Sequence, residues 1–237
     1  ANVDGFDYSD PDVEWSKRPE IDRWILSLLN SLVKDVDGYL EAYEPTRAGR
    51  AISDFVNDNL SNWYVRLNRR RFWGGGMTED KLSAYQTLYT CLETVAKLMA
   101  PIAPFYADQL FLDLVAVTGR ENVESVHLSD FPVYDESKID KNLEERMQMA
   151  QDVSSMVLAL RRKVNIKVRQ PLQCITVPVV DEEQKAHIEA VKNLIMNEVN
   201  VKEVRFVDGA AGVLVKKVKC DFKKLGPKFG KQMKAVA

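Results

Sequence analysis

Apolar side chains recur every three or four residues over four long stretches of the first half of the chain, which is the spacing of one face of an α-helix. The pattern predicts helices at residues 19 to about 42, 45–73, 78–99 and 105–117. A proline stands at the start of the first two helices, and the three glycines at 74–76 end the second. Because long amphipathic helices joined by short loops tend to pack antiparallel, we expect a helix bundle.

The hydrophobic period changes in the second half of the chain. A fifth long helix is predicted from about residue 140 to 164. Beyond it, residues 172–180 are rich in β-forming side chains, residues 182–199 have helical spacing, and residues 201–207 and 212–218 are typical of strands. The expected fold class is therefore mainly α, with an anticipated helix bundle followed by a small mixed α/β domain.

Charge divides the chain near the same point. Residues 1–150 carry 16 Lys and Arg against 26 Asp and Glu, whereas residues 151–237 carry 17 against 9. We therefore expect a helical domain at 1–150 and a small α/β domain at 151–237, joined by the fifth long helix. A basic second part suits a polyanionic partner, although an ordinary lysine-covered surface explains the charge equally well.

Composition excludes several classes of protein. Apolar residues make up 46% of the chain and glycine and proline are few, which excludes disordered and collagen-like chains. No uncharged apolar run approaches the ~20 residues that cross a bilayer, and the acidic start is unlike a signal peptide. We therefore expect no membrane partner and a cytoplasmic location. Three widely separated cysteines and two isolated histidines predict neither disulfides nor a metal site.

An arginine-rich segment at the end of the second predicted helix carries the most informative chemistry. On a regular α-helix, Asn59, Asn62, Arg66 and Arg69 share one face, beside the apolar face that contains Trp63. Guanidinium groups bind phosphates, amides read base edges, and aromatic rings stack on unpaired bases. The alternative is that these cations complement the helix dipole and the tryptophans belong to the core. The candidate RNA-binding residues of this segment are Asn59, Asn62, Trp63, Tyr64, Arg66, Arg69, Arg70, Arg71 and Trp73.

A second group of cations lies at the end of the fifth predicted helix and in the turn after it. These side chains could hold a phosphate backbone, or they could be a solvated helix end. Eight further lysines between residues 216 and 234 suit non-specific phosphate contacts. The candidate tRNA-binding residues of the second group are Arg161, Arg162, Lys163, Lys167 and Arg169.

Several segments of the chain, taken together, carry a resemblance to a known family. The pattern Asn62-Trp63-Tyr64-x-Arg66-x-x-Arg69-Arg70-Arg71-Phe72-Trp73 resembles the anticodon-binding helix of class I isoleucyl-tRNA synthetases. The valyl and leucyl relatives share the helix bundle and remain alternatives. Further segments that agree in order and spacing are Asp22-Arg23-Trp24-Ile25-Leu26-Ser27, Met99-Ala100-Pro101-Ile102-Ala103-Pro104-Phe105, Ser125-Val126-His127-Leu128, Arg169-Gln170-Pro171-Leu172 and Leu225-Gly226-Pro227-Lys228-Phe229-Gly230-Lys231.

The resemblance implies a function for the longer protein. Such enzymes use ATP and magnesium to attach isoleucine to tRNA(Ile), and they do so in domains whose signatures this chain lacks. The resemblance therefore implies a non-catalytic C-terminal portion, with no cofactor of its own, which binds the anticodon arm of tRNA(Ile) and works with the rest of the synthetase in cis. A free-standing RNA-binding module and a purely structural bundle are the two rival interpretations.

Overall fold

The computed structural model describes residues 4–208. The strand expected at 212–218 and the lysine-rich segment after it lie outside the described residues. Contacts divide the chain into two units, Ala1–Glu145 and Arg146–Ala237. Helix α6, Lys141–Lys163, runs across this division, as the fifth predicted helix does.

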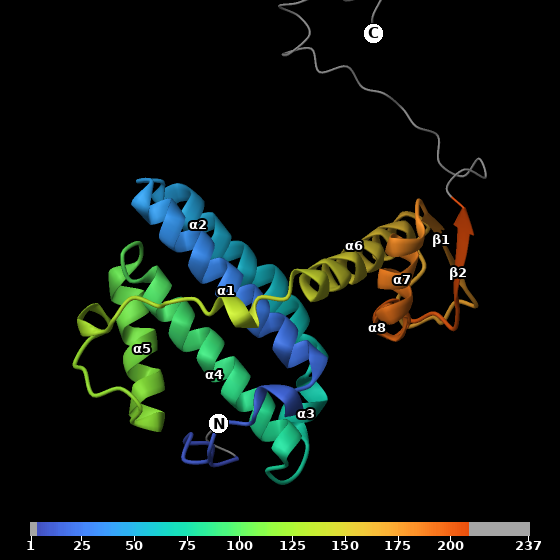
Figure 1. Ribbon diagram of the computed structural model, residues 1–237. Helices are drawn as coiled ribbons and strands as arrows, with labels where there is room; N and C mark the ends of the chain where they lie inside the picture. The colour runs from blue at the N-terminus through green and yellow to red at the C-terminus, as the bar shows by residue number, and fades with distance from the viewer. Residues whose placement is uncertain (1–3, 209–237) are drawn as a thin grey trace, which may run out of the picture. The chain divides into compact units, whose positions relative to one another are not determined.

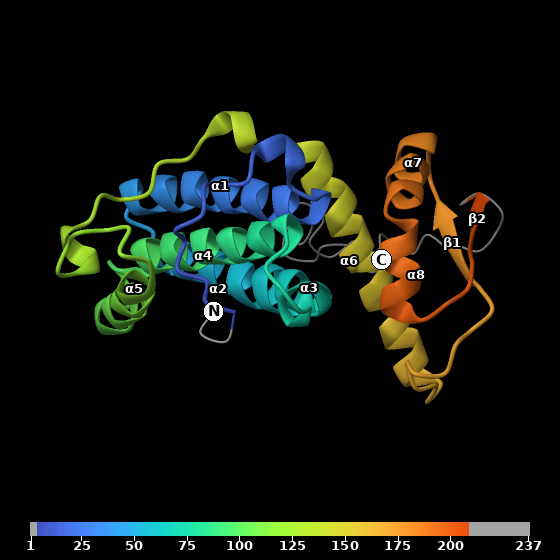
Figure 2. The ribbon, with the colours of Figure 1, turned by 90° about the horizontal axis from the view of Figure 1, so that it is seen from below.

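The first unit is a helix bundle made of two helical hairpins (Figure 1 and Figure 2). In the first hairpin, α1 (Glu20–Glu41) is followed by α2 (Pro45–Asp54), which folds back against it. In the second, α4 (Glu79–Met99) packs against α5 (Pro104–Thr118). Contacts between α1 and α4 join the two hairpins, so the predicted bundle is confirmed, with three of its four long helices, α1, α4 and α5, as expected. Short 3-10 turns lie at Trp15–Lys17, Val126–Leu128 and Glu136–Lys138.

The helix ends follow the punctuation of the sequence. Pro45 occupies the first turn of α2, where its missing N–H is not needed. The Thr78 hydroxyl accepts a hydrogen bond from the backbone N–H of Lys81 at 3.2 Å and so caps the N-terminus of α4. Gly119 ends α5 in the left-handed conformation, at φ 62°, which glycine adopts without strain.

The long second helix predicted for residues 45–73 is interrupted. After α2 the chain forms a π-helix, η2, over Phe55–Val65, and it then turns at Asn68 into the short helix α3, Arg69–Trp73. A π-helix has wider turns than an α-helix, because its hydrogen bonds span five residues. Side-chain directions therefore differ from those expected on a regular helix, and Trp63 and Tyr64 are both buried.

The face of α4 that packs in the core only partly matches the face that the apolar spacing predicts, of which Tyr89, Val95 and Ala96 are buried. Its buried positions include Ser83, Ala84, Gln86 and Thr87, all of them small or polar. The polar ones are satisfied by distant partners: Gln86 Oε1 accepts from the backbone N–H of Val13 at 2.9 Å, and the Ser83 hydroxyl donates to Asp22 at 2.6 Å. The remaining apolar side chains expected in the core lie half-buried along a different stripe, and they are Leu82, Tyr85, Leu88, Leu92 and Met99.

The second unit contains a small β-α-β arrangement, as expected for a mixed α/β part. Strands β1 (Ile175–Val179) and β2 (Val204–Asp208) pair in parallel, with Ile175 opposite Val204. The helical segment between them breaks at Val191 into α7 (Glu182–Ala190) and α8 (Lys192–Val199). Apolar side chains of strands and helices form the core of this unit, and they include Val177, Val179, Ile188, Ile195, Val199 and Val204.

Candidate nucleic-acid interface

Asp22, on α1, lies at the centre of a buried polar network. Its carboxylate has no exposed surface. One carboxylate oxygen accepts from the Tyr64 hydroxyl at 2.8 Å and from Arg71 Nη1 at 2.7 Å. The other accepts from Arg71 Nη2 at 2.9 Å and from the Ser83 hydroxyl at 2.6 Å. Four segments, α1, η2, α3 and α4, are thereby joined at one carboxylate.

Three of the candidate RNA-binding residues belong to the interior instead of the surface. Tyr64 has no exposed surface, and its burial, together with the charge and hydrogen bond of Asp22, raises the pKa of the phenol well above its usual value. Arg71 is held by Asp22 and by Asp80, whose carboxylate lies 2.8 Å from Nη2. Trp63 is only 8% exposed. The expectation that these three side chains face a nucleic acid is therefore corrected: they pack in or brace the bundle.

The neighbouring side chains Arg69, Arg70 and Trp73 are exposed, and together they are called the Trp73 platform here. Trp73 is 74% exposed, and the guanidinium carbon of Arg69 lies 4.7 Å from the centroid of its ring. Arg69 and Trp73 border an open hollow of about 780 Å³. The buried network fixes α3 from inside, so the platform is presented on a braced helix.

The remaining candidates of this segment lie on η2 and just after it. Asn62 and Arg66 are exposed, whereas Asn59 is half-buried. The Arg66 Nε donates to the backbone carbonyl of Asn62 at 2.7 Å, which keeps these two residues together. Asn62 and Arg66 thus remain exposed candidates, while the expectation that all four polar side chains share one face of a regular helix does not apply to the π-helix.

In the second unit, Arg161 is buried, and backbone carbonyl groups occupy its guanidinium group. Its side chain is 3% exposed. Nη1 donates to the carbonyls of Lys167 and Gln170, at 3.2 and 3.0 Å, and Nη2 donates to those of Val199 and Asn200, at 2.8 and 3.0 Å. The guanidinium group thus ties the end of α8 to the loop after α6. The other four candidates of this group are exposed around that loop, and they are Arg162, Lys163, Lys167 and Arg169.

The sequence interpretation missed a group of exposed aromatic rings where α2 and α5 begin. Tyr43 is 92% exposed, Phe105 90% and Tyr106 63%. The signal was present in the two prolines, 101 and 104, which end α4 and start α5. Residues directly after such a break lie in the first turn of a helix, where little of the bundle can cover them.

Comparison with known proteins identifies the family. A family model described as the anticodon-binding domain of tRNA ligase matches residues 22–176, which is more than half of the chain. The chain belongs to this family. The matched residues run from Asp22, the centre of the buried network, through all the helices of the bundle and α6 into β1.

Relatives of this anticodon-binding domain carry a consistent name. Isoleucine–tRNA ligase of Bacteroides fragilis is 80% identical over the whole chain, and that of Cytophaga hutchinsonii is 56% identical over 236 residues. Isoleucine–tRNA ligase of Thermus thermophilus is 40% identical over 98% of the chain. The chain spans about a fifth of the length of these relatives, 21%, 21% and 22% respectively.

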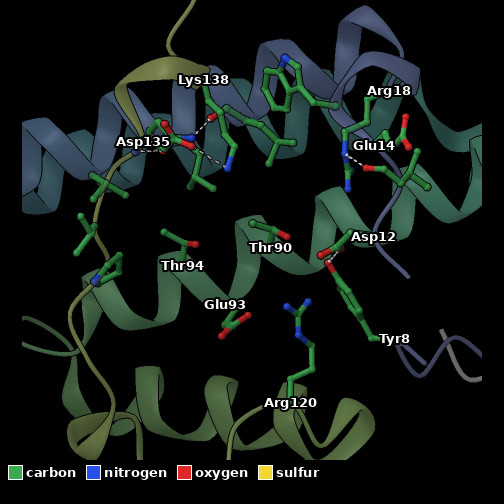
Figure 3. A pocket seen from close by; sticks show the side chains of 18 residues that line it. Tyr8, Asp12, Glu14, Arg18, Thr90, Glu93, Thr94, Arg120, Asp135 and Lys138 are labelled. Atoms are coloured by element: carbon green, nitrogen blue, oxygen red, sulfur yellow. Dashed lines mark hydrogen bonds and ion pairs between the residues drawn. The ribbon is translucent and has the colours of Figure 1, made fainter. Parts of the chain in front are cut away.

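The anticodon-binding domain has another hollow, of about 560 Å³, between α1 and α4 (Figure 3). Its lining carries four carboxylates against three cations, which are Arg18, Arg120 and Lys138. The Tyr8 hydroxyl donates to Asp12 at 2.7 Å, the Arg120 guanidinium lies 3.9 Å from the centroid of the Tyr8 ring, and Lys138 pairs with Asp135 at 3.1 Å. This hollow therefore lacks the excess of positive charge that attracts a nucleic acid.

Residues 4–208 contain neither a membrane-spanning helix nor a cluster of metal ligands. In this part of the chain, no helix has the length and apolar character needed to span a membrane. Within the same residues, no three His, Cys, Asp or Glu side chains gather as possible ligands of a metal ion.

Proposed function

We propose that this chain is the tRNA-recognition part of an isoleucine–tRNA ligase and that it binds the anticodon arm of tRNA(Ile). The observation that carries the proposal is the Trp73 platform, an exposed pair of arginines and an exposed indole on a helix braced by Asp22. The match to anticodon-binding domains and the shared name of its relatives support the same function.

The chemistry of the exposed residues suits an RNA hairpin. An unpaired base can stack on the Trp73 ring, and the two arginines can each contact a phosphate. Asn62 and Arg66 are the proposed base readers of η2, with the half-buried Asn59 beside them. Exposed cations of the second unit would contact further phosphates and set the register of the RNA, and they are Arg162, Lys163, Lys167 and Arg169.

The longer enzyme would use ATP and magnesium to activate isoleucine and transfer it to the tRNA, in the cytoplasm. Those steps are proposed for the rest of the synthetase, which acts in cis with this domain. No residue of this chain is proposed to take part in those steps. The contribution of this domain is to select and position the tRNA.

Replacing both Arg69 and Arg70 with alanine should weaken binding of tRNA(Ile) and flatten its dependence on salt. Each lost phosphate contact removes about 0.7–0.9 from the slope of log K against log salt, so the double variant should lose about 1.5. Filter binding at four salt concentrations measures affinity and slope together. Arg205→Ala is a matched control, because Arg205 is also exposed but is paired with Glu203 at 2.9 Å.

The same titration separates the rival functions. An isoleucine-specific anticodon domain should bind tRNA(Ile) more tightly than the same tRNA with an altered anticodon and more tightly than a noncognate tRNA. A general RNA-binding module should bind all three alike, and a structural bundle should show no salt-dependent binding. An unchanged slope in the folded Arg69/Arg70 variant would exclude the platform as a phosphate-binding surface.

A further inference from the structure

A further hollow lies between two parts of the bundle. One side is formed by α2 and η2, and the other by α5. It has a volume of about 340 Å³ and a largely apolar floor that includes Ile52, Val95 and Leu110. We call it the α2–α5 slot, and its mouth is formed by Gly49, Ser53, Asn57, Ile102 and Tyr106. Gly49 and Ile102 face each other across the mouth, because a Cβ at Gly49 would lie 3.8 Å from Ile102 Cδ1. A side chain at position 49 would therefore narrow the mouth.

One edge of the slot is polar. Ser53 and Asn57 are exposed, and the Asn57 amide nitrogen donates to the Ser53 hydroxyl at 3.2 Å. That bond uses one N–H of the amide and orients the side chain, while the Asn57 carbonyl oxygen and second N–H are not used by it. An oriented amide with a donor and an acceptor can pair with the edge of a nucleobase.

The opposite edge and the approach to the slot suit an RNA strand. Tyr106 lines the mouth and is 63% exposed, so its ring is available for stacking. Arg50 is exposed one helical turn before Ser53, on the same side of α2, where it can meet a phosphate. An apolar floor, a stacking ring, a base-reading amide and a guanidinium group are what a single unpaired nucleotide requires.

The slot and the Trp73 platform belong to one seam of the bundle. The half-buried stripe of α4 lines both, with Tyr85 and Leu88 in the platform hollow and Leu92 and Met99 in the slot. A smaller hollow of about 150 Å³ includes Tyr85, Leu88 and Leu92 and so links the two. A strand that contacts the platform can therefore continue along α4 to the slot.

We propose that the α2–α5 slot binds one unpaired nucleobase of the anticodon loop, with Tyr106 stacking on the base and Asn57 reading its edge. The inference rests on the proposed function, and it adds a site at the far end of the same seam. The exposed guanidinium group of Arg50 favours a nucleotide over an apolar peptide, because only the nucleotide brings a phosphate for it to contact.

The test is a thermodynamic cycle on the intact 237-residue chain. Wild type, Tyr106→Ala, Asn57→Ala and Tyr106→Phe are titrated with the anticodon hairpin of tRNA(Ile), and with hairpins that carry one abasic residue at each loop position in turn. Fluorescence anisotropy gives the affinities, and thermal unfolding checks the fold. Gln109→Ala is the control, because Gln109 is exposed on α5 one turn beyond Tyr106. Its amide nitrogen donates a hydrogen bond to Asp113 on the same helix.

For the intact hairpin, Tyr106→Ala should cost about tenfold in affinity, the typical loss of one base–aromatic stack. A hairpin that is abasic at one particular loop position should bind wild type about tenfold more weakly than the intact hairpin does. Tyr106→Ala should bind that abasic hairpin and the intact hairpin with the same affinity. Asn57→Ala should reduce discrimination between bases at that position, whereas Tyr106→Phe and Gln109→Ala should bind as wild type does.

Two outcomes overturn the inference in different ways. In the first, wild type binds the hairpin and the Arg69/Arg70 variant binds it more weakly, but the slot variants bind as wild type does. The same conclusion follows if the affinity lost by a slot variant adds to the affinity lost at every abasic position. Either result shows that the slot does not hold a base. If wild type binds no hairpin at all, the proposed function fails and the slot assignment fails with it.

Discussion

Replacing Asp22 with alanine should lower the free energy of unfolding of the bundle by about 3–5 kcal/mol, the usual cost of removing one partner from a buried ion pair. The variant leaves the Arg71 guanidinium, whose side chain is 16% exposed, without its inner carboxylate. It also removes the acceptor of the Tyr64 and Ser83 hydroxyls. Urea unfolding followed by tryptophan fluorescence measures the loss, since Trp24 and Trp63 are both buried in this unit.

Two variants of the same network serve as controls. Asp80→Ala removes the outer, half-exposed partner of Arg71 and should cost at most about 1 kcal/mol, as an exposed ion pair does. Tyr64→Phe removes one hydrogen bond to a carboxylate and should cost about 1.5–3 kcal/mol, less than the loss of the carboxylate itself. If Asp22→Ala were as stable as Asp80→Ala, the buried carboxylate would not be the group that holds the four segments together.

The Asp22 network also connects stability with RNA binding. Arg71 is sequence neighbour to Arg70, yet the two side chains have opposite roles: Arg71 is engaged inside, and Arg70 is exposed on the platform. A variant that frees Arg71 should therefore loosen α3 and the platform with it. We expect Asp22→Asn, which keeps the shape of the side chain but loses its charge, to weaken tRNA binding although no atom of Asp22 is exposed.

The elements of the bundle could be predicted because their signals are local. Apolar spacing and proline placement are read within one or two helical turns, and they give α1, α4, α5 and α6 to within a few residues. The face that each helix buries depends on distant partners. The polar side of α4 is buried because Arg18 donates to Thr87 at 2.8 Å across 69 residues of sequence, and no periodicity reports such a pairing.

The kinds of side chain at the candidate site could be predicted from the sequence, but not which of the residues are exposed. The arginine-rich segment does contain exposed cations and an exposed indole, while its role in RNA binding stays a prediction. Which arginine stays free is decided by carboxylates and carbonyls far along the chain: Arg71 meets Asp22, 49 residues away, and Arg161 meets Val199, 38 residues away. The π-helix adds a second cause, because its wider turns place Tyr64 in the core.

Arg161→Ala should destabilise the second unit by about 2–4 kcal/mol, because the substitution leaves carbonyl groups around a buried position without their donor. Val199 and Asn200 lose their contact at the end of α8, and Lys167 and Gln170 lose theirs in the loop. All four tryptophans lie at or before residue 73, so fluorescence does not report on this unit. Amide hydrogen exchange of β1 and β2 does, and protection there should fall.

Arg161→Lys distinguishes the geometry of the guanidinium group from its charge. A lysine ammonium keeps the charge but cannot present two forked nitrogens to carbonyls on opposite sides, so it should recover only part of the loss. Arg162→Ala, the exposed neighbour, should leave exchange unchanged while it weakens tRNA binding. In the reverse result, Arg161→Ala would show normal hydrogen exchange, and the salt dependence of its tRNA binding would be reduced as in Arg162→Ala. That result would assign Arg161 to the phosphate-binding surface. The burial of its side chain, 3% exposed, argues for the first outcome, because a guanidinium group that already serves four carbonyls has little surface to offer an RNA.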